Sequence, residues 1–252
     1  VKFEGGKLPS SIGGLIHLRF LSLDDAGVSH LPSSMRNLKL LLYLNLSVAI
    51  GEPVHVPNVL KEMLELRYLF LPWFKHDKTK LELGDLVNLE HLWSFSTQHS
   101  SVTDLLRMTK LRHLSVSLSE RCTFETLSSS LRQLRNLETL YLDFSPKTNY
   151  VGELVLDFIH LKELVLTVRM SKIPDQHQFP PHLEHISLFN CGVEEDPMPI
   201  LEKLLHLKSV KLTFEAFVGR KMVCSKGGFP QLRALKIYKH SELEEWIVEE
   251  GS

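Results

Sequence analysis

The sequence predicts an α/β solenoid in which short parallel strands and return segments alternate along the chain. Three observations predict it: a recurring apolar hexapeptide, a nearly constant spacing, and an in-out alternation inside each hexapeptide. Ten segments follow or approach the pattern Leu-x-x-Leu-x-Leu, and their first leucines lie 22 to 26 residues apart. Such recurrence is typical of architectures whose units bury their apolar side chains against neighbouring units.

The ten segments are the predicted strands in chain order. They begin at Leu18, Leu41, Leu66, Leu89, Leu111, Leu137, Leu161, Leu183, Leu207 and Leu232. This period is that of leucine-rich repeats, each of which contributes one strand and one return segment. We therefore expect a leucine-rich-repeat solenoid of about ten repeats, shaped as an irregular horseshoe with a parallel β-sheet on its concave face. The position that often holds Asn or Cys in such repeats fits only at Cys191, which predicts an irregular arc and a buried, structural thiol there.

The return segments are polar and variable. The clearest predicted helix is Asp196–Leu207, where Asp196 can cap the helix and Pro197 suits its first turn. Weaker helical patterns cover Thr123–Leu134 and Val56–Leu64.

Composition excludes several classes of function. The 252 residues include 29 basic and 30 acidic side chains, so no global field favours nucleic acid or an anionic membrane. The three cysteines are widely spaced and form no C-x-x-C pair, which favours a reducing compartment. No apolar run approaches the ~20 residues of a transmembrane helix.

Both ends of the chain predict a piece of a longer protein. Leu8–Leu15 resembles the tail of a repeat whose strand lies upstream, and nothing in Leu243–Ser252 closes the core. Because solenoids need polar caps, we expect residues 1–252 to be one leucine-rich-repeat domain that is uncapped at both ends.

Function is expected on the outward positions of the strands, because alternate side chains of a strand point to opposite faces. The candidate protein-binding residues of the concave face are Tyr43, Tyr68, Phe70, His91, Trp93, Phe95, His113, Tyr141, Lys211, Lys236 and Tyr238. Rings on two adjacent predicted strands should form one aromatic patch, and exposed aromatic patches often mark protein interfaces. The alternative is that a loop or an adjoining domain covers these rings.

The last two predicted strands form a modest basic edge. It contains Lys211, Lys236 and Tyr238, with Arg220, Lys221 and Lys226 in the intervening loop. The edge could meet an acidic partner or another domain, and a merely solvated face is an equal alternative. These residues are too few to predict nucleic-acid binding.

The sequence lacks patterns for catalysis. It has no phosphate-binding P-loop, no H-E-x-x-H zinc motif and no G-x-S-x-G nucleophile elbow. His91 and His113 occupy equivalent positions on adjacent predicted strands, but no carboxylate or cysteine joins them by spacing. We expect no enzyme activity, no metal and no cofactor in this chain.

Several segments of the sequence resemble those of plant intracellular immune receptors of the coiled-coil nucleotide-binding leucine-rich-repeat class. The resemblance is to the downy-mildew resistance group of crucifers in particular. The segments are Leu86–Thr97, Asp104–Val116, Val155–Leu164, Glu194–Leu212, Gly219–Ile237 and Leu243–Ser252. The resemblance implies a sensor that restrains an upstream nucleotide-binding domain and recognises a pathogen effector or a guarded host protein. It also implies coiled-coil and nucleotide-binding domains that are absent from this chain, with ADP or ATP bound by the latter.

The same resemblance implies a cytoplasmic location, or one peripheral to a membrane in the full-length receptor, and a role in the hypersensitive defence response. The repeats alone leave two alternatives open. One is a non-immune intracellular scaffold or ubiquitin-ligase adaptor. The other is an extracellular receptor ectodomain, against which the single sequon, at Asn45, argues.

Overall fold

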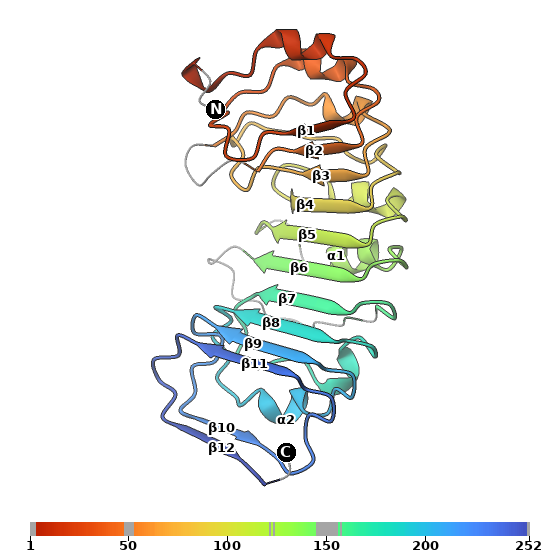
Figure 1. The fold of residues 1–252 in the computed structure, drawn as a ribbon. Helices are drawn as coiled ribbons and strands as arrows, with labels where there is room; N and C mark the ends of the chain where they lie inside the picture. The colour runs from red at the N-terminus through yellow and green to blue at the C-terminus, as the bar shows by residue number, and fades with distance from the viewer. Residues whose placement is uncertain are drawn as a thin grey trace. The chain divides into compact units, whose positions relative to one another are not determined.

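A computed structural model of the chain describes residues 4–47, 53–120, 122, 124–144, 156 and 158–250. The chain forms two compact units. The first unit comprises Val1–Ser117 and Ser129–Asn136, and the second comprises Leu118–Ser128 and Leu137–Ser252. Each unit carries its own succession of parallel strands joined by return segments (Figure 1).

The first unit is built on five parallel strands that pair in chain order. They are β1 (Phe20–Ser22), β2 (Tyr43–Asn45), β3 (Tyr68–Phe70), β4 (His91–Ser96) and β5 (His113–Leu118). The pairing sets Leu21, Leu44, Leu69, Leu92 and Leu114 side by side. The last four of these leucines are fully buried, which confirms the predicted in-out alternation in this part of the sheet.

The second unit repeats this arrangement. Its strands are β6 (Thr139–Phe144), β7 (Glu163–Thr167), β8 (His185–Phe189), β9 (Ser209–Thr213) and β11 (Ala234–Tyr238). Leu140, Leu164, Ile186, Val210 and Leu235 align across them. Across the described residues, the two units together supply the ten parallel strands that the repeat spacing predicts.

A small second sheet in the second unit was not expected. It pairs β10 (Lys221–Cys224) with β12 (Glu245–Val248) in parallel, and it lies apart from β9 and β11 (Figure 1). The prediction that Arg220 and Lys221 join the basic edge is therefore wrong. Their side chains instead pair with Glu244 at 3.7 Å and Glu245 at 3.1 Å.

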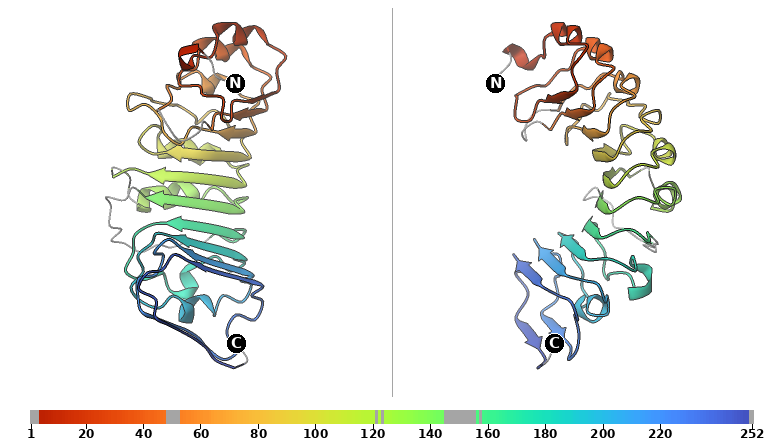
Figure 2. Two further views of the ribbon diagram at one scale, coloured as in Figure 1. Left: turned by 60° about the vertical axis from the view of Figure 1, so that its left-hand side comes forward. Right: turned by 45° about the vertical axis from the view of Figure 1, so that its right-hand side comes forward.

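The return segments are mostly short 3₁₀ turns. These are Glu4–Gly6, Ser10–Gly14, Ser33–Asn37, Leu60–Glu62, Val102–Arg107 and Gln176–Gln178, and the α-helices are α1 (Phe124–Leu131) and α2 (Met198–Leu201). Within each unit they lie on one side of the strands (Figure 2). A 3₁₀ turn rises ~2.0 Å per residue against ~1.5 Å in an α-helix, so it spans the return path with fewer residues.

The predicted helices are accordingly shorter than expected. Within Asp196–Leu207 only Met198–Leu201 is α-helical, and Val56–Leu64 contains only the turn Leu60–Glu62. The prediction that Asp196 caps the helix is wrong, because the N-cap residue of α2 is Pro197, without a side-chain capping bond. The Asp196 carboxylate lies one residue earlier and accepts hydrogen bonds from the backbone N–H of Met198 at 2.9 Å and of Val223, in β10, at 2.8 Å. This side chain thereby also ties the return segment to the second sheet.

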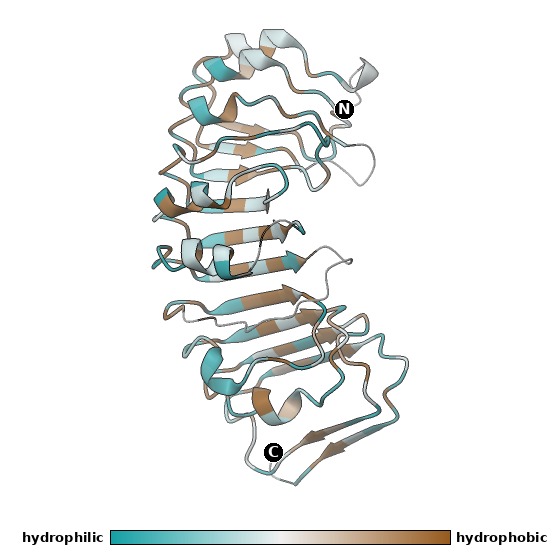
Figure 3. Ribbon diagram, turned by 180° about the vertical axis from the view of Figure 1, so that it is seen from behind, coloured by the Kyte–Doolittle hydropathy of each residue, from teal (hydrophilic) through white to brown (hydrophobic). Residues whose placement is uncertain are grey.

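The core is a stack of leucine layers between the strands and the return segments. In both units the strands show alternating hydrophobic and hydrophilic bands (Figure 3). Cys191 lies in this core as predicted: it is fully buried, and its thiol donates to the Leu166 carbonyl at 3.3 Å. Burial raises the pKa of the Cys191 thiol to about 11, so it stays protonated at neutral pH.

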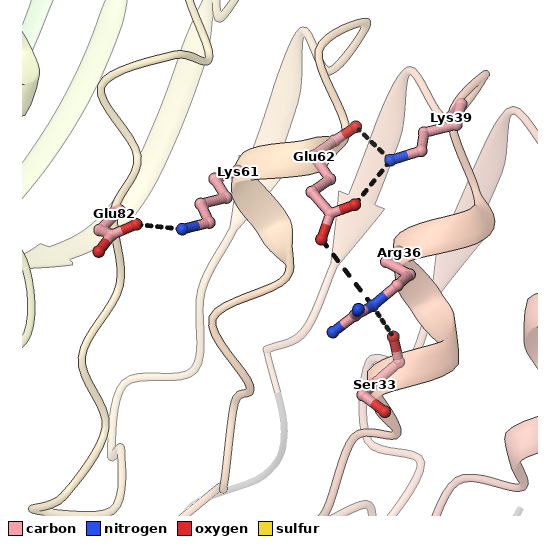
Figure 4. Close-up of polar contacts among 6 residues, drawn as sticks. All are labelled: Ser33, Arg36, Lys39, Lys61, Glu62 and Glu82. Atoms are coloured by element: carbon pink, nitrogen blue, oxygen red, sulfur yellow. Dashed lines mark hydrogen bonds and ion pairs between the residues drawn. The ribbon is translucent and has the colours of Figure 1, made fainter.

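Exposed ion pairs join successive return segments of the first unit (Figure 4). Glu62 binds the ammonium of Lys39 at 2.9 Å and lies 3.8 Å from the guanidinium of Arg36. Lys61 pairs with Glu82 of the following repeat. The side of the molecule away from the strands is thus charged and internally compensated at these positions.

Candidate protein-binding surface

The outward side chains of the strands form what we call the open face, the side of each sheet turned away from the leucine core. An open face is present in each unit, and its composition differs between them. In the first unit it is mainly aromatic, whereas in the second unit it is partly basic.

An aromatic ladder runs across all five strands of the first unit, one ring per strand. Its members are Phe20, Tyr43, Tyr68, His91 and His113, which are direct register partners from each strand to the next. The ring centroids are 4.2, 6.0, 4.6 and 4.1 Å apart in chain order, and three of the four pairs are stacked. The parallel strands, ~4.8 Å apart, impose this spacing.

A second row of rings lies two residues further along the strands. Phe70 and Trp93 are stacked with centroids 6.2 Å apart and planes at 5°. Tyr43 of the ladder reaches Phe70 at 5.5 Å, so the two rows are in contact. The predicted patch on adjacent strands is therefore present, and it extends over more strands than the sequence indicated.

Phe95 is the exception, and its predicted outward position is wrong. The register of β4 against β5 shifts between Leu92 and Phe95, and Ser94 adopts a left-handed φ of 58°. This β-bulge inserts one residue and reverses the alternation beyond it. Phe95 consequently turns into the core, where its side chain is 0% exposed.

A buried lysine holds the bulge in place. The ammonium of Lys75 donates to the Ser94 carbonyl and to the Pro72 carbonyl, each at 2.8 Å. Burial lowers the pKa of Lys75 to about 8. The sequence does carry a signal for the bulge: the third apolar position of this repeat is Ser94, and the apolar side chain comes one residue later, at Phe95.

The predicted residues of the second unit fall into two places. Tyr141 on β6 is partly buried and donates from its hydroxyl to Glu163 at 3.3 Å. Burial first, and then the Glu163 carboxylate, raises the pKa of Tyr141. Lys211 and Lys236 are direct register partners on β9 and β11, and Tyr238 lies two residues beyond Lys236.

Sequence reasoning missed four side chains of these surfaces. Phe20, 60% exposed, begins the aromatic ladder. Phe189 and Phe214 have ring centroids 4.8 Å apart, and the Lys239 ammonium lies 4.6 Å from the Phe214 ring. Strand alternation places Phe20 and Phe189 outward, but it gives no reason to group them with the other rings. Phe214 and Lys239 are the first residues after β9 and β11, and both have left-handed backbone conformations. Strand periodicity does not predict where their side chains point.

The match to known families covers nearly the whole chain. Residues 4–251 match the family described as a leucine-rich repeat region. The chain belongs to this leucine-rich repeat family. The match agrees with the parallel strands and leucine layers of both units, and it confirms the predicted fold class.

The leucine-rich repeats are closely similar to those of plant disease resistance proteins. Over all of this chain, the sequence is 79% identical to disease resistance RPP8-like protein 3 and 77% identical to disease resistance protein RPP8, both from Arabidopsis thaliana. The predicted resemblance to the downy-mildew resistance group is thereby confirmed. The chain spans only 28% of the length of each relative.

Solved structures give the same fold at low sequence identity. An internalin (inlF) from Listeria monocytogenes str. 4b F2365 superposes with a TM-score of 0.60 at 17% identity, over 95% of this chain and 70% of that chain. At this identity the likeness shows the leucine-rich-repeat fold alone.

Within the described ranges, no cluster of three or more His, Cys, Asp or Glu side chains is arranged to hold a metal ion. None of the helices in that part of the chain has the length and apolar content that crossing a bilayer requires. His91 and His113 stack face to face, with planes at 14°, a geometry suited to ring contact.

Proposed function

We propose that this chain is the sensor and autoinhibitory leucine-rich-repeat region of an intracellular plant immune receptor. It recognises a pathogen effector or a modified host protein by protein–protein contact and thereby triggers the defence response. The observation that carries this proposal is the 79% identity, over the whole chain, to a plant disease resistance protein. In the full-length receptor, coiled-coil and nucleotide-binding domains precede this region, and the receptor acts in the cytoplasm.

The aromatic ladder supports a binding role. Tyr and Trp side chains are frequent in the energetically important centres of protein interfaces, since they bring a large contact area at little cost in conformational entropy. Here Tyr43, Tyr68 and Trp93 are already held in position by neighbouring rings. When a partner covers these rings, the rings lose little side-chain freedom, and this favours affinity.

The mechanism we propose is a two-state equilibrium of the whole receptor. In the closed state, the repeat surface docks on the upstream nucleotide-binding domain and keeps ADP bound there. A ligand activates only if it binds the open state more tightly than the closed state, because equal affinity shifts no population. Release then permits exchange of ADP for ATP, oligomerisation and local cell death. The nucleotide binds the upstream domain and not this chain.

The test uses the full-length receptor that contains this chain, expressed transiently in leaf tissue. Phe70→Ala with Trp93→Ala removes the second row of rings, and Trp246→Ala, an exposed tryptophan on β12, is the matched control. We expect the ring variant to change basal cell death, or cell death on challenge with a downy-mildew isolate that the wild type resists. Immunoblots must show equal protein levels. Unchanged responses in both assays would count against the proposal.

A further inference from the structure

The second unit carries an exposed surface that combines lysines with aromatic rings. We call it the lysine–aromatic patch, and its members are Phe189, Lys211, Phe214, Lys236, Tyr238 and Lys239. The three rings are 39%, 38% and 46% exposed in chain order. They are in mutual contact, since the Phe214 centroid lies 4.8 Å from that of Phe189 and 5.5 Å from that of Tyr238.

Two of the three lysines in the patch are arranged unfavourably toward each other in the isolated chain. Lys211 and Lys236 face each other directly across β9 and β11, and like charges directly opposite in a sheet are destabilising. Lys239 extends over the neighbouring rings, 4.6 Å from the Phe214 centroid and 5.4 Å from the Tyr238 centroid. Positive charge is therefore concentrated over a small area.

No carboxylate of the described residues forms an ion pair with these three lysines. Other lysines of the same unit differ: Lys208 binds Glu184 at 2.7 Å, and Lys221 binds Glu245 at 3.1 Å. The acidic side chain nearest in sequence to Phe214, Glu215, is engaged elsewhere, because it accepts a hydrogen bond from the backbone N–H of Ser241 at 3.1 Å. The chain as a whole is nearly neutral, so the uncompensated charge is a local feature.

We propose that the patch binds an acidic peptide segment of a protein partner, with an aromatic or large apolar side chain between its carboxylates. The carboxylates would neutralise Lys211 and Lys236, which removes their mutual repulsion. The apolar side chain would cover the Phe214 and Tyr238 rings. This inference rests on the proposed function to the extent that the open face is a protein-binding surface, and it adds the chemistry of the segment that is recognised.

The ring geometry favours a peptide over a nucleic acid. Single-stranded nucleic acids bind where successive bases stack on aromatic faces along a basic groove. Here the planes of Phe189 and Phe214 meet at 41°, and those of Phe214 and Tyr238 at 77°. Tilted and edge-on rings beside three lysines make a compact surface for one side chain and its neighbouring charges, rather than a track for a backbone.

The test measures fluorescence anisotropy of labelled peptides added to the 252-residue chain. The probe is a short peptide of alternating aspartate and glutamate around one phenylalanine. Three control probes are used. In one peptide alanine replaces the phenylalanine, in a second peptide lysine replaces the aspartates and glutamates, and the third probe is an oligothymidylate. We expect the acidic phenylalanine peptide to bind with a dissociation constant of about 10–100 µM, since few contacts are made. Binding should weaken about tenfold between ~50 mM and ~500 mM NaCl, because salt screens exposed charges.

Matched variants locate the binding. Lys211→Gln with Lys236→Gln should weaken it about tenfold, as expected for two lost charge contacts. Lys203→Gln with Lys226→Gln removes two exposed lysines outside the patch and should leave it unchanged. Phe214→Asn, which tolerates the left-handed conformation of this position, should abolish the preference for phenylalanine over alanine. Circular dichroism verifies that each variant is folded.

Several results would overturn the inference. They are an absence of binding by the acidic phenylalanine peptide, equal loss in the patch and control variants, equal binding of the alanine peptide, and binding of the lysine peptide or oligothymidylate at least as tight. The outcome is separable from that of the proposed function. Peptide binding is measured in vitro and is located by variants of the second unit, whereas the cell-death assay perturbs the rings of the first unit in the full receptor.

Discussion

The open faces of the two units differ although the strands beneath them are built alike. In both units, leucine or an equivalent aliphatic residue aligns across neighbouring strands and fills the core. On the first unit the outward positions are rings that contact one another, whereas on the second unit two of them are lysines that face each other. The repeat dictates where outward side chains lie, and their chemistry decides what the surface does.

The two faces also differ in their expected effect on stability. Aromatic pairs contribute about 0.5–1.5 kcal/mol beyond the area they bury, so the ladder helps to hold the first unit together. Opposed lysines contribute nothing or cost a few tenths of a kcal/mol. A surface that stabilises its own fold can exist without a partner. In the lysine–aromatic patch the ring contacts and the lysine–ring contacts are also favourable. The opposed charges of Lys211 and Lys236 are not, and this uncompensated pair is the feature that indicates a ligand.

The largest expected effect is a loss of folding stability on truncating core leucines, and it shows whether the cores of the two units are equivalent. Leu92→Ala in the first unit and Leu166→Ala in the second each remove a fully buried side chain. Both should lower the free energy of unfolding by about 2–5 kcal/mol, because a cavity adds to the lost transfer energy. Leu205→Ala, at an exposed position, is the control. Urea denaturation measures all three, and a large disparity between Leu92 and Leu166 would place the difference between the units in the core.

The next effect concerns the bulge, which β4 has against β5 and which is absent from the described pairs β6–β7, β7–β8, β8–β9 and β9–β11. The folded-state pKa of Lys75, about 8, lies below its ordinary value of 10.5. Between these values the unfolded chain binds more protons at this site, so stability rises with pH. The gain is at most about 3 kcal/mol, and the two carbonyl contacts, which favour the charged form, reduce it.

The measurement compares urea denaturation of the wild type with that of Lys75→Met from pH 7.5 to 10.5. The wild type should gain stability over this range relative to the variant, which has no titrating group at the position. Parallel curves would contradict the assignment of the low pKa to Lys75. Loss of β4 register in the variant would show that the lysine also sets the geometry of the aromatic rows.

The sequence was sufficient to predict where the strands lie, because the leucine spacing is a direct consequence of the stacking of repeats. It predicted ten strands, their alternation and most of the outward rings. It failed at Phe95, where strict alternation was applied across Ser94, and the polar residue in an apolar position was the neglected signal. It also failed at β10 and β12, whose pairing joins segments that carry no repeat pattern. Contacts made by residues beyond strand ends, such as Phe214, depend on backbone turns that periodicity does not describe.

A smaller effect compares the two open faces directly. Tyr43 contacts Phe20, Tyr68 and Phe70, so Tyr43→Ala should lower the free energy of unfolding by about 1–2 kcal/mol. Lys211→Ala should leave it unchanged or raise it by up to about 0.5 kcal/mol, because it removes one of two opposed charges. Tyr43→Phe retains the ring and serves as the control. The comparison fails if the lysine substitution destabilises the chain as much as the tyrosine substitution does.

The smallest effect is expected where the two units should not differ, at the ion pairs between successive repeats. Hydrogen bonding to Lys39 lowers the pKa of Glu62 in the first unit, and hydrogen bonding to Lys208 lowers the pKa of Glu184 in the second. A glutamate whose folded-state pKa is lowered stabilises the fold at pH values above its unfolded-state pKa. This contribution is lost as the pH falls through the folded-state pKa.

Glu62→Gln and Glu184→Gln should therefore each lower the melting temperature slightly at neutral pH and low salt. The difference from the wild type should begin to shrink as the pH falls through the ordinary range of a glutamate, about 4.3, and should vanish below the lowered folded-state pKa. It should also shrink in high salt, which screens exposed pairs. A difference that persists in acid would assign the effect to packing of the glutamate side chain rather than to its charge.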